Sequence, residues 1–292
     1  MAWIQRYLVL ILVFVSLAMY LLALRLGLQT ELAVTAVSVF TLASAWWLER
    51  RQPYRKEWRQ DRGDLQTDVA SAVVIVGVVD PLLKVLAPLA VVALYSSLNV
   101  QPVLAGVALW LQIVVVLLLV ELGKYWSHRL HHQLEPLWWL HAMHHSSERL
   151  YFLNGLRFHP INYVLNFTVA VLPVMLLGVS PEAIVGYLAI SQPVVLLQHA
   201  NIGLQHGWLN WVFSTPEAHR WHHATEPAEA NSNFGNALLV WDHVFGTFKA
   251  AEGFIETKEI GLFASSKAIY PRRGGYLTQL VSMFKPPCCR SA

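Results

Sequence analysis

Nine of the chain's 13 histidines lie in three short motifs that share one spacing. The motifs are His128-Arg-Leu-His131-His132, His141-Ala-Met-His144-His145 and His219-Arg-Trp-His222-His223. Residues three and four positions apart lie on the same face of a helix, so each motif would present a ridge of imidazoles. Imidazole is a common nitrogen ligand for iron, zinc, copper and nickel, and three facing ridges could surround two metal ions.

A single motif of this kind could equally be the solvated face of a helix. Three copies are harder to explain in that way in a chain that is 55% hydrophobic and only 13% charged. Burying nine unpaired imidazoles would be costly, and metal coordination removes that cost. The sequence contains no Glu-x-x-His pair and no His-Glu-x-x-His motif, which argues against a carboxylate-bridged di-iron bundle and against a zinc peptidase.

The elements that must position these histidines are membrane helices. Long apolar runs and a positive mean hydropathy predict an all-α polytopic membrane protein. We expect about four transmembrane helices, a helical hairpin and a cytoplasmic His-rich helical cap. The four apolar runs that predict the spans are 7–24, 32–48, 68–98 and 103–122, and the two that predict the hairpin are 161–177 and 183–197.

The charge pattern predicts the orientation of these helices. The segment from Glu49 to Asp64 is rich in arginine and follows the second span, so the positive-inside rule makes it cytoplasmic, as a solvated linker. Four spans return the chain to this side, with the first His motif at the end of the fourth, and the hairpin brings the third motif back. The run 68–98 is longer than one span needs. It predicts one kinked or tilted helix, with a broken re-entrant pair as the alternative.

Three further motifs complete an ordered set with the histidine ridges. They are Arg157-Phe-His159-Pro160, His199-Ala-Asn201 and Trp241-Asp-x-x-Phe-Gly-Thr247. Over about residues 105–250 the set resembles the fatty acid hydroxylase and sterol desaturase superfamily of integral membrane proteins. The resemblance implies a di-iron centre that uses O₂ and external electrons to hydroxylate or desaturate an unactivated C–H bond of a lipid. Zinc could replace iron in purified protein, because bare affinity favours it.

The resemblance also implies the metal ligands, and it predicts no catalytic residue beyond them. The expected ligands are His128, His131, His132, His141, His144, His145, His159, His199, His219, His222 and His223. For His131 and His159 a hydrogen-bonding role is the alternative. The side chains expected to orient the imidazoles are those of Glu148, Asn154, Asn201, Asn233 and Asp242.

The resemblance divides the chain into three regions. We expect transmembrane helices with a basic cytoplasmic loop over 1–104, a fatty acid hydroxylase-like catalytic domain over 105–250, and a cytoplasmic or interfacial tail over 251–292. An apolar stripe from Tyr276 to Phe284 predicts a helix in the tail, either on the membrane surface or packed on the protein body.

The expected partners are a lipid substrate from the bilayer and a separate electron-donor protein, because no cytochrome b₅-like or flavin-binding segment is visible. Nucleic-acid binding is not expected, since the basic residues flank membrane spans. The alternative function is a divalent-metal-binding or metal-transport membrane protein. Such a transporter should carry ionisable ligands at mid-membrane depth, where the chain offers only Asp80 and Lys84.

Overall fold

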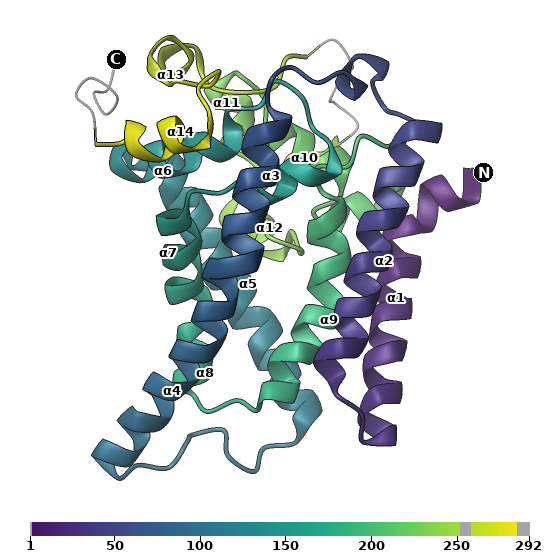
Figure 1. Cartoon of the computed structure of the whole chain (residues 1–292). Helices are drawn as coiled ribbons and strands as arrows, with labels where there is room; N and C mark the ends of the chain where they lie inside the picture. The colour runs from purple at the N-terminus through teal and green to yellow at the C-terminus, as the bar shows by residue number, and fades with distance from the viewer. Residues whose placement is uncertain (1, 252–257, 285–292) are drawn as a thin grey trace.

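The computed structural model describes residues 2–251 and 258–284, and within these ranges the chain forms helices and no strand (Figure 1). Four of the helical segments are long and apolar enough to cross a membrane. They are α1 (Ala2–Leu26), α2 (Thr30–Arg51), the continuous segment Leu65–Leu98, and α5 (Leu109–Gln133). The prediction of an all-α protein with about four spans is therefore confirmed.

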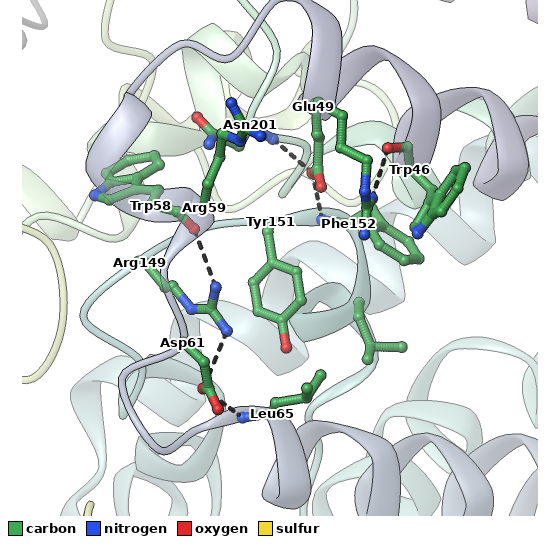
Figure 2. Close-up of a pocket in the computed structure, with 12 residues that line it drawn as sticks. Trp46, Glu49, Trp58, Arg59, Asp61, Leu65, Arg149, Tyr151, Phe152 and Asn201 are labelled. Carbon is green, nitrogen blue, oxygen red and sulfur yellow. Dashed lines mark hydrogen bonds and ion pairs between the residues drawn. The ribbon is translucent and has the colours of Figure 1, made fainter.

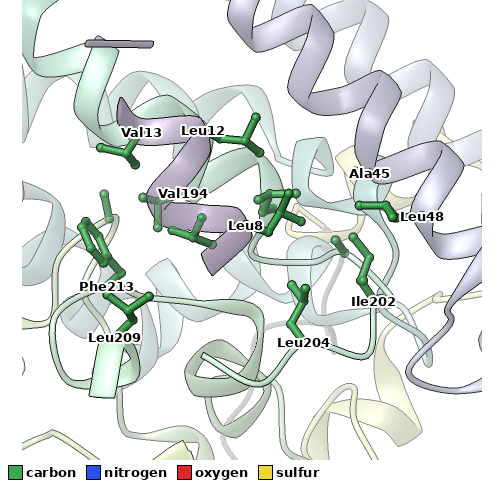
Figure 3. Packing of buried hydrophobic residues seen from close by; sticks show 14 residues of the cluster. Leu8, Leu12, Val13, Ala45, Leu48, Val194, Ile202, Leu204, Leu209 and Phe213 are labelled. Carbon is green, nitrogen blue, oxygen red and sulfur yellow. The ribbon is translucent and has the colours of Figure 1, made fainter. Parts of the chain in front are cut away.

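Helices α1, α2 and α9 (Pro181–Leu197) pack together on one side of the bundle (Figure 1). Their ends near the histidines share a buried apolar cluster with the chain after α9 (Figure 3). Leu8 and Leu12 of α1 pack with Val194 of α9 there, and Leu209 and Phe213, from the chain after α9, belong to the same cluster. This cluster fixes the end of α9 and with it the segment that carries His199.

Helix α5 packs against α9 and against the first half of the predicted hairpin, which is divided into α7 (Pro160–Ala170) and α8 (Leu172–Leu176). Gly123 allows the close approach of α5 to α7, since a Cβ at this position would lie 2.6 Å from the Cα of Ala170. Val116 and Val120 of α5 are buried against Val174 and Ala183 beyond this point. The end of α5 that carries His128 is thereby held against α7.

The segment Leu65–Leu98 is one helix of 34 residues, so the alternative of a broken re-entrant pair is wrong. It consists of α3 (Leu65–Val74), a π-helical turn η2 (Ile75–Val79) and α4 (Asp80–Leu98). Asp80 pairs with Lys84 one turn later at 2.6 Å and also accepts a hydrogen bond from Tyr163 of α7. Pairing within the span satisfies both ionisable groups.

The remaining helices lie toward one end of the bundle, where all but α12 form a cap and α12 packs below them against α5 (Figure 1). They are η1 (Lys56–Arg59), α6 (Glu135–His145), η3 (Phe152–Leu156), η4 (Gly207–Trp211), α10 (Pro216–His222), α11 (Pro227–Ala230), α12 (Val240–Phe245), α13 (Ala264–Ile269) and α14 (Tyr276–Ser282). The cap carries the second and third His motifs, and the first lies at the end of α5 beneath it.

One boundary differs from the sequence-based expectation. Helix α5 begins at Leu109 instead of Val103, because residues 103–107 form turns that include Gly106 at φ 78°. The chain breaks between α5, which ends at Gln133, and α6, which carries Pro136 in its first turn, where a backbone N–H has no internal partner in any case.

The expectation of a solvated linker between the second and third spans is wrong. Asp64 is buried, and its carboxylate accepts hydrogen bonds from Arg149 Nη2 at 2.7 Å and from Ser147 Oγ at 2.9 Å. Burial alone would raise the pKa of Asp64, but the hydrogen bonds from Arg149 outweigh it and lower the pKa. Glu49 and Trp58 are buried as well. The basic loop is therefore part of the packed cap.

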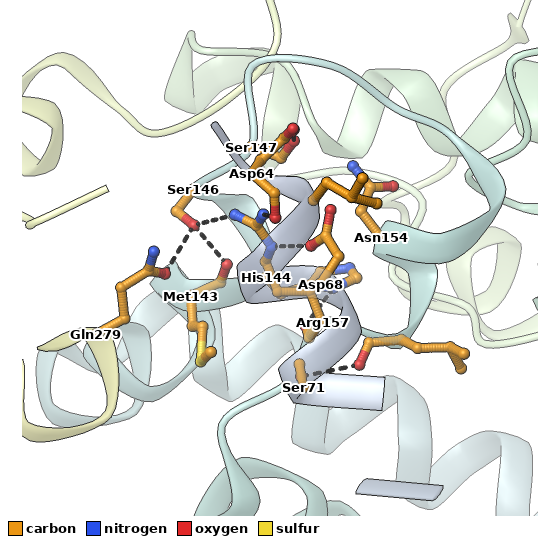
Figure 4. Close-up of polar contacts among 12 residues, drawn as sticks. Asp64, Asp68, Ser71, Met143, His144, Ser146, Ser147, Asn154, Arg157 and Gln279 are labelled. Atoms are coloured by element: carbon orange, nitrogen blue, oxygen red, sulfur yellow. Dashed lines mark hydrogen bonds and ion pairs between the residues drawn. The ribbon is translucent and has the colours of Figure 1, made fainter. Parts of the chain in front are cut away.

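A second buried ion pair joins α3 to the cap. Arg157 pairs through Nε with Asp68, and both side chains are excluded from solvent. Arg157 also donates to Ser146 Oγ at 2.9 Å and to the carbonyl oxygen of Asp64 at 3.0 Å (Figure 4). Tyr151 donates its hydroxyl to the other Asp68 oxygen. The network ties the third span to the segment that follows α6.

For the tail helix, packing on the protein body describes one face, and a position on the membrane surface stays a prediction for the other. Tyr276 and Leu280 of α14 pack with Trp138 and Trp139 of α6. Leu277, on the other face, is 74% exposed, and Val281 is also exposed. One face thus contacts the protein body, and the other presents apolar side chains outward. Cys288 and Cys289, which the chain carries after this helix, lie outside the described residues.

Candidate metal centre

Nine histidines converge into two adjacent groups beneath the cap. Within each group one nitrogen from every side chain lies within 4.8 Å of the others. The first group is His128, His132, His141, His145 and His222, and the second group is His144, His199, His219 and His223. The groups touch, since the rings of His145 and His223 stack with centroids 4.3 Å apart.

The helical period explains why neighbouring histidines enter different groups. His141 and His145 of α6 are four residues apart and point to the first group, whereas His144 points to the second. In α10, His222 joins the first group and His219 joins the second, as does His223, which directly follows the helix. Thus α6 and α10 each contribute to both groups, α5 contributes only to the first, and the segment after α9 contributes His199.

Oxygen acceptors fix the tautomer of five of these imidazoles. Each of the five directs Nδ1 at an oxygen, so Nδ1 carries the proton and Nε2 retains its lone pair. The distances from Nδ1 are 2.9 Å for His128 to Phe234 O, 3.1 Å for His141 to Asn162 Oδ1, 3.1 Å for His144 to Arg157 O, 2.8 Å for His199 to Asn154 Oδ1 and 3.2 Å for His222 to Ser232 O.

Burial keeps the clustered imidazoles uncharged. It lowers the pKa of His144 to about 3. Burial, followed by the neighbouring imidazoles, also holds the pKa of His145 and of His222 well below the ordinary value. Neutral imidazole is the form that binds a metal.

The spacing of the free nitrogens fits a metal ion. His128 Nε2 and His141 Nε2 lie 3.0 Å apart, although the oxygen partners of both Nδ1 atoms leave neither Nε2 with a proton to donate. Two lone pairs facing each other in a buried site repel, and a cation bound by both removes the repulsion. Two nitrogens about 2.1 Å from one metal and at right angles would lie about 3.0 Å apart. The residues present therefore fit a metal centre.

Two of the predicted ligands lie outside both groups. His131 uses both nitrogens in hydrogen bonds, donating from Nδ1 to Ser127 O at 2.7 Å and accepting at Nε2 from Asn162 at 2.8 Å. His159 caps α7, since its Nδ1 accepts from the N–H of Ile161 at 3.1 Å, and its Nε2 lies 3.2 Å from Leu280 O. The hydrogen-bonding alternative describes the geometry of both residues.

Of the five expected orienting side chains, Asn154 alone contacts a clustered histidine directly. Asp242 acts one step further out, because its carboxylate accepts the backbone N–H of Phe234, whose carbonyl oxygen accepts from His128. Asn233 donates to Ala218 O within α10. The other two, Glu148 and Asn201, bond to residues outside the two groups.

Sequence reasoning missed Asn162, which is buried on α7 and bridges two histidines. Its Oδ1 accepts from His141, and its Nδ2 donates to His131. The signal in the sequence that could have identified Asn162 is its position three residues after His159. The remaining partners are backbone carbonyl groups, which no residue type reveals.

We expect Asn162→Ala to lower metal affinity or turnover about 10–100-fold, because the His141 ring loses the acceptor that fixes its tautomer. The measurements are metal content after dialysis against a chelator and turnover of the loaded protein. Asn166→Ala, one turn further along α7, removes an acceptor for Ser127 without touching a clustered histidine and serves as the control. Equal losses in both variants would contradict the orienting role.

The fold and the two histidine groups define a multi-pass membrane protein with a histidine-rich metal centre. Residues 113–247 match the sequence model of the fatty acid hydroxylase family. The chain belongs to the fatty acid hydroxylase family. The matched range contains all nine clustered histidines.

Several proteins are similar in sequence to this chain. The chain is 34% identical over 222 residues to ornithine lipid hydroxylase OlsE of Rhizobium tropici. The aligned region covers 73% of the chain and 66% of that protein. It is 31% identical over 129 residues to alkylglycerol monooxygenase of Xenopus tropicalis, covering 44% of the chain and 28% of that protein. The human alkylglycerol monooxygenase is 29% identical over 131 residues, or 45% of the chain and 29% of that protein. No solved structure matches the chain.

Proposed function

We propose that the protein is an oxygen-dependent lipid hydroxylase of the membrane and that its nine clustered histidines bind two iron ions. The observation that carries the proposal is the convergence of two groups of neutral imidazoles at the end of a membrane bundle. The names of the relatives, a lipid hydroxylase and a monooxygenase, favour hydroxylation over desaturation.

In this proposal the first group supplies five nitrogen ligands and the second supplies four. Fewer than six donors per ion leave coordination positions for oxygen. When bound, the iron pair supplies the redox chemistry that inserts one atom of O₂ into a C–H bond, while the other atom leaves as water at the expense of two external electrons and two protons.

The chain's own residues hold and shield this centre. Seven of the nine clustered histidines come from helices whose ends are fixed by buried packing or ion pairs, so the ligand nitrogens are placed before metal binds. Eight of the nine are buried, and His128 is half-buried. This burial excludes bulk water from the reaction.

The lipid enters from the bilayer in this proposal, and electrons come from a separate protein. The histidine groups lie at the same end of the bundle as the basic loop that follows α2, which contacts the cap through Asp64 and Arg149. The positive-inside rule assigns that end to the cytoplasm. An electron donor in the cytoplasm would therefore reach the cap directly.

No observation favours metal transport as a second function. Asp80, the acidic group near the middle of the third span, is engaged by Lys84 and Tyr163. The histidines lie at the end of the bundle, away from the mid-membrane depth at which transporters bind their cargo.

The decisive test is lipid mass spectrometry on cells that express the protein under isotopically labelled oxygen, combined with iron analysis of freshly prepared membranes. We expect wild type to produce a lipid that carries one labelled oxygen atom, and His144→Ala to produce none. Unchanged lipids together with the absence of bound iron in wild type would refute the proposal.

A further inference from the structure

A pocket of about 300 Å³ lies beside the metal centre, between the end of α2 and the start of α3 (Figure 2). Trp46 and Trp58 line it on opposite sides, and the segment that carries Arg149, Tyr151 and Phe152 forms its inner wall. None of these residues belongs to the histidine groups. The volume is at the lower end of the range for ligand pockets and suits a small polar group better than an acyl chain.

Glu49 is the unusual residue of this pocket. It is only 6% exposed, and its Oε1 accepts two backbone N–H groups, from Phe152 at 2.7 Å and from Asn201 at 2.8 Å. Among residues 2–251 and 258–284, no cation pairs with this carboxylate, and its Oε2 has no hydrogen-bond donor. Figure 2 shows the carboxylate directed into the pocket above the ring of Tyr151. A buried carboxyl group stays ionised only when a cation or further donors meet it, so the pocket is suited to a ligand with a positive charge.

Two guanidinium groups line the outer part of the same pocket. Arg50 stacks over Trp46 at 4.0 Å and donates to its carbonyl oxygen, and Arg59 is exposed. Neither arginine forms an ion pair within the described part of the chain. Arg149, by contrast, is engaged by Asp64 at 2.7 Å. The pocket thus offers an inner carboxylate and outer cationic donors, an arrangement that complements a ligand with both charges.

The position of the pocket identifies the source of such a ligand. It opens where two spans end, beside Trp46 and Leu65, whose side chains are 45% and 43% exposed. Tryptophan and arginine at the end of a span mark the level of the lipid headgroups. The pocket also adjoins the second histidine group, because Asn201 lies two residues after His199, and Asn154, which follows Leu153 of the pocket wall, accepts from His199 at 2.8 Å.

We infer that this pocket binds the zwitterionic headgroup of a membrane lipid. The Glu49 carboxylate pairs with the ammonium group, and Arg50 and Arg59 pair with the phosphate or carboxylate of the same headgroup. The inference rests on the proposed function, of which it specifies the substrate class: the bound headgroup is that of the lipid to be hydroxylated.

The test uses native mass spectrometry of the full-length protein in detergent with phosphatidylethanolamine and phosphatidylglycerol of identical acyl chains. Wild type should retain phosphatidylethanolamine about tenfold more strongly than phosphatidylglycerol, because one favourable ion pair in a partly buried site provides a ratio of this size. Glu49→Gln, which keeps an acceptor for the two backbone N–H groups, should abolish this preference. Arg59→Gln should weaken retention of both lipids, since both carry a phosphate.

Glu57→Gln is the matched control, because Glu57 is an exposed carboxylate on η1 that does not line the pocket. It should leave the preference unchanged. Equal retention of the two lipids by wild type, or a preference that survives Glu49→Gln, would overturn the headgroup site. Binding needs neither iron nor turnover, so this result stands apart from a failure of the hydroxylase proposal.

The labelled-oxygen assay then separates a substrate from a structural lipid. If the bound lipid is the substrate, Glu49→Gln should reduce the labelled product while iron content stays at the wild-type level. Loss of phosphatidylethanolamine retention with undiminished product would overturn the assignment of the pocket to the substrate.

Discussion

Replacing His145 with alanine should remove metal from the first histidine group and reduce lipid hydroxylation to background. The Nε2 atom of His145 lies 3.2 Å from that of His132, 3.2 Å from that of His141 and 3.1 Å from that of His222. It is the nitrogen that three of the other four members of the group share as a neighbour. Its removal leaves a gap in the ligand set that the remaining buried side chains cannot close.

The measurement is metal content per chain, by elemental analysis, beside product formation. We expect His145→Ala to retain about half of the wild-type metal, because the four histidines of the second group keep their positions. His159→Ala is the comparison: it removes a helix cap, with a loss of about 1 kcal/mol in stability, but should keep the full metal content. Full metal in His145→Ala, or loss in His159→Ala, would contradict the division into ligands and non-ligands.

The features that could be predicted from the sequence are those with a local period. Three-and-four spacing predicted that His141 and His145 share a helix face, and that face meets His222. Long apolar runs predicted the four spans, since the thickness of a bilayer translates directly into a number of helical residues. The allocation of ligands to two groups also follows from the helical period, once the helices are known to face each other.

The features that could not be predicted depend on contacts between distant segments. His128, His144 and His222 are oriented by carbonyl oxygens of Phe234, Arg157 and Ser232. Every residue carries a backbone carbonyl group, so composition and spacing cannot show which carbonyl oxygens orient the histidines. Helix α10 meets α6 only because the hairpin through α7 and α9 returns the chain to the cap.

Burial of the basic loop illustrates the same limit. A segment dense in arginine and acidic residues predicts exposure, and most of its side chains are indeed exposed. Its two buried carboxylates, those of Glu49 and Asp64, have partners that lie 152 and 85 residues away, at Asn201 and Arg149. Charge density alone cannot distinguish a solvated linker from a wall of a binding pocket.

Arg157→Met should cost about 3–5 kcal/mol in the free energy of unfolding, because it leaves the Asp68 carboxylate buried without its cation. The change also removes the donors to Ser146 and to the carbonyl oxygen of Asp64, so the third span loses its main tie to the cap. The measurement is unfolding in mixed detergent micelles, with the denaturant midpoint compared between variants. The backbone carbonyl that orients His144 remains, so the folded fraction should still bind metal.

A second substitution distinguishes the uncompensated charge from lost packing. In Asp68→Asn/Arg157→Met the buried group is neutral and still accepts from the hydroxyl of Tyr151, so the double variant should be more stable than Arg157→Met alone. Lys267→Met is the matched control, since it removes a partner from Glu148 in a half-exposed pair at 3.3 Å and should cost no more than about 1 kcal/mol. If the double variant were no more stable than Arg157→Met, the lost contacts of the guanidinium with Ser146 and Asp64, and not the stranded carboxylate, would account for the instability.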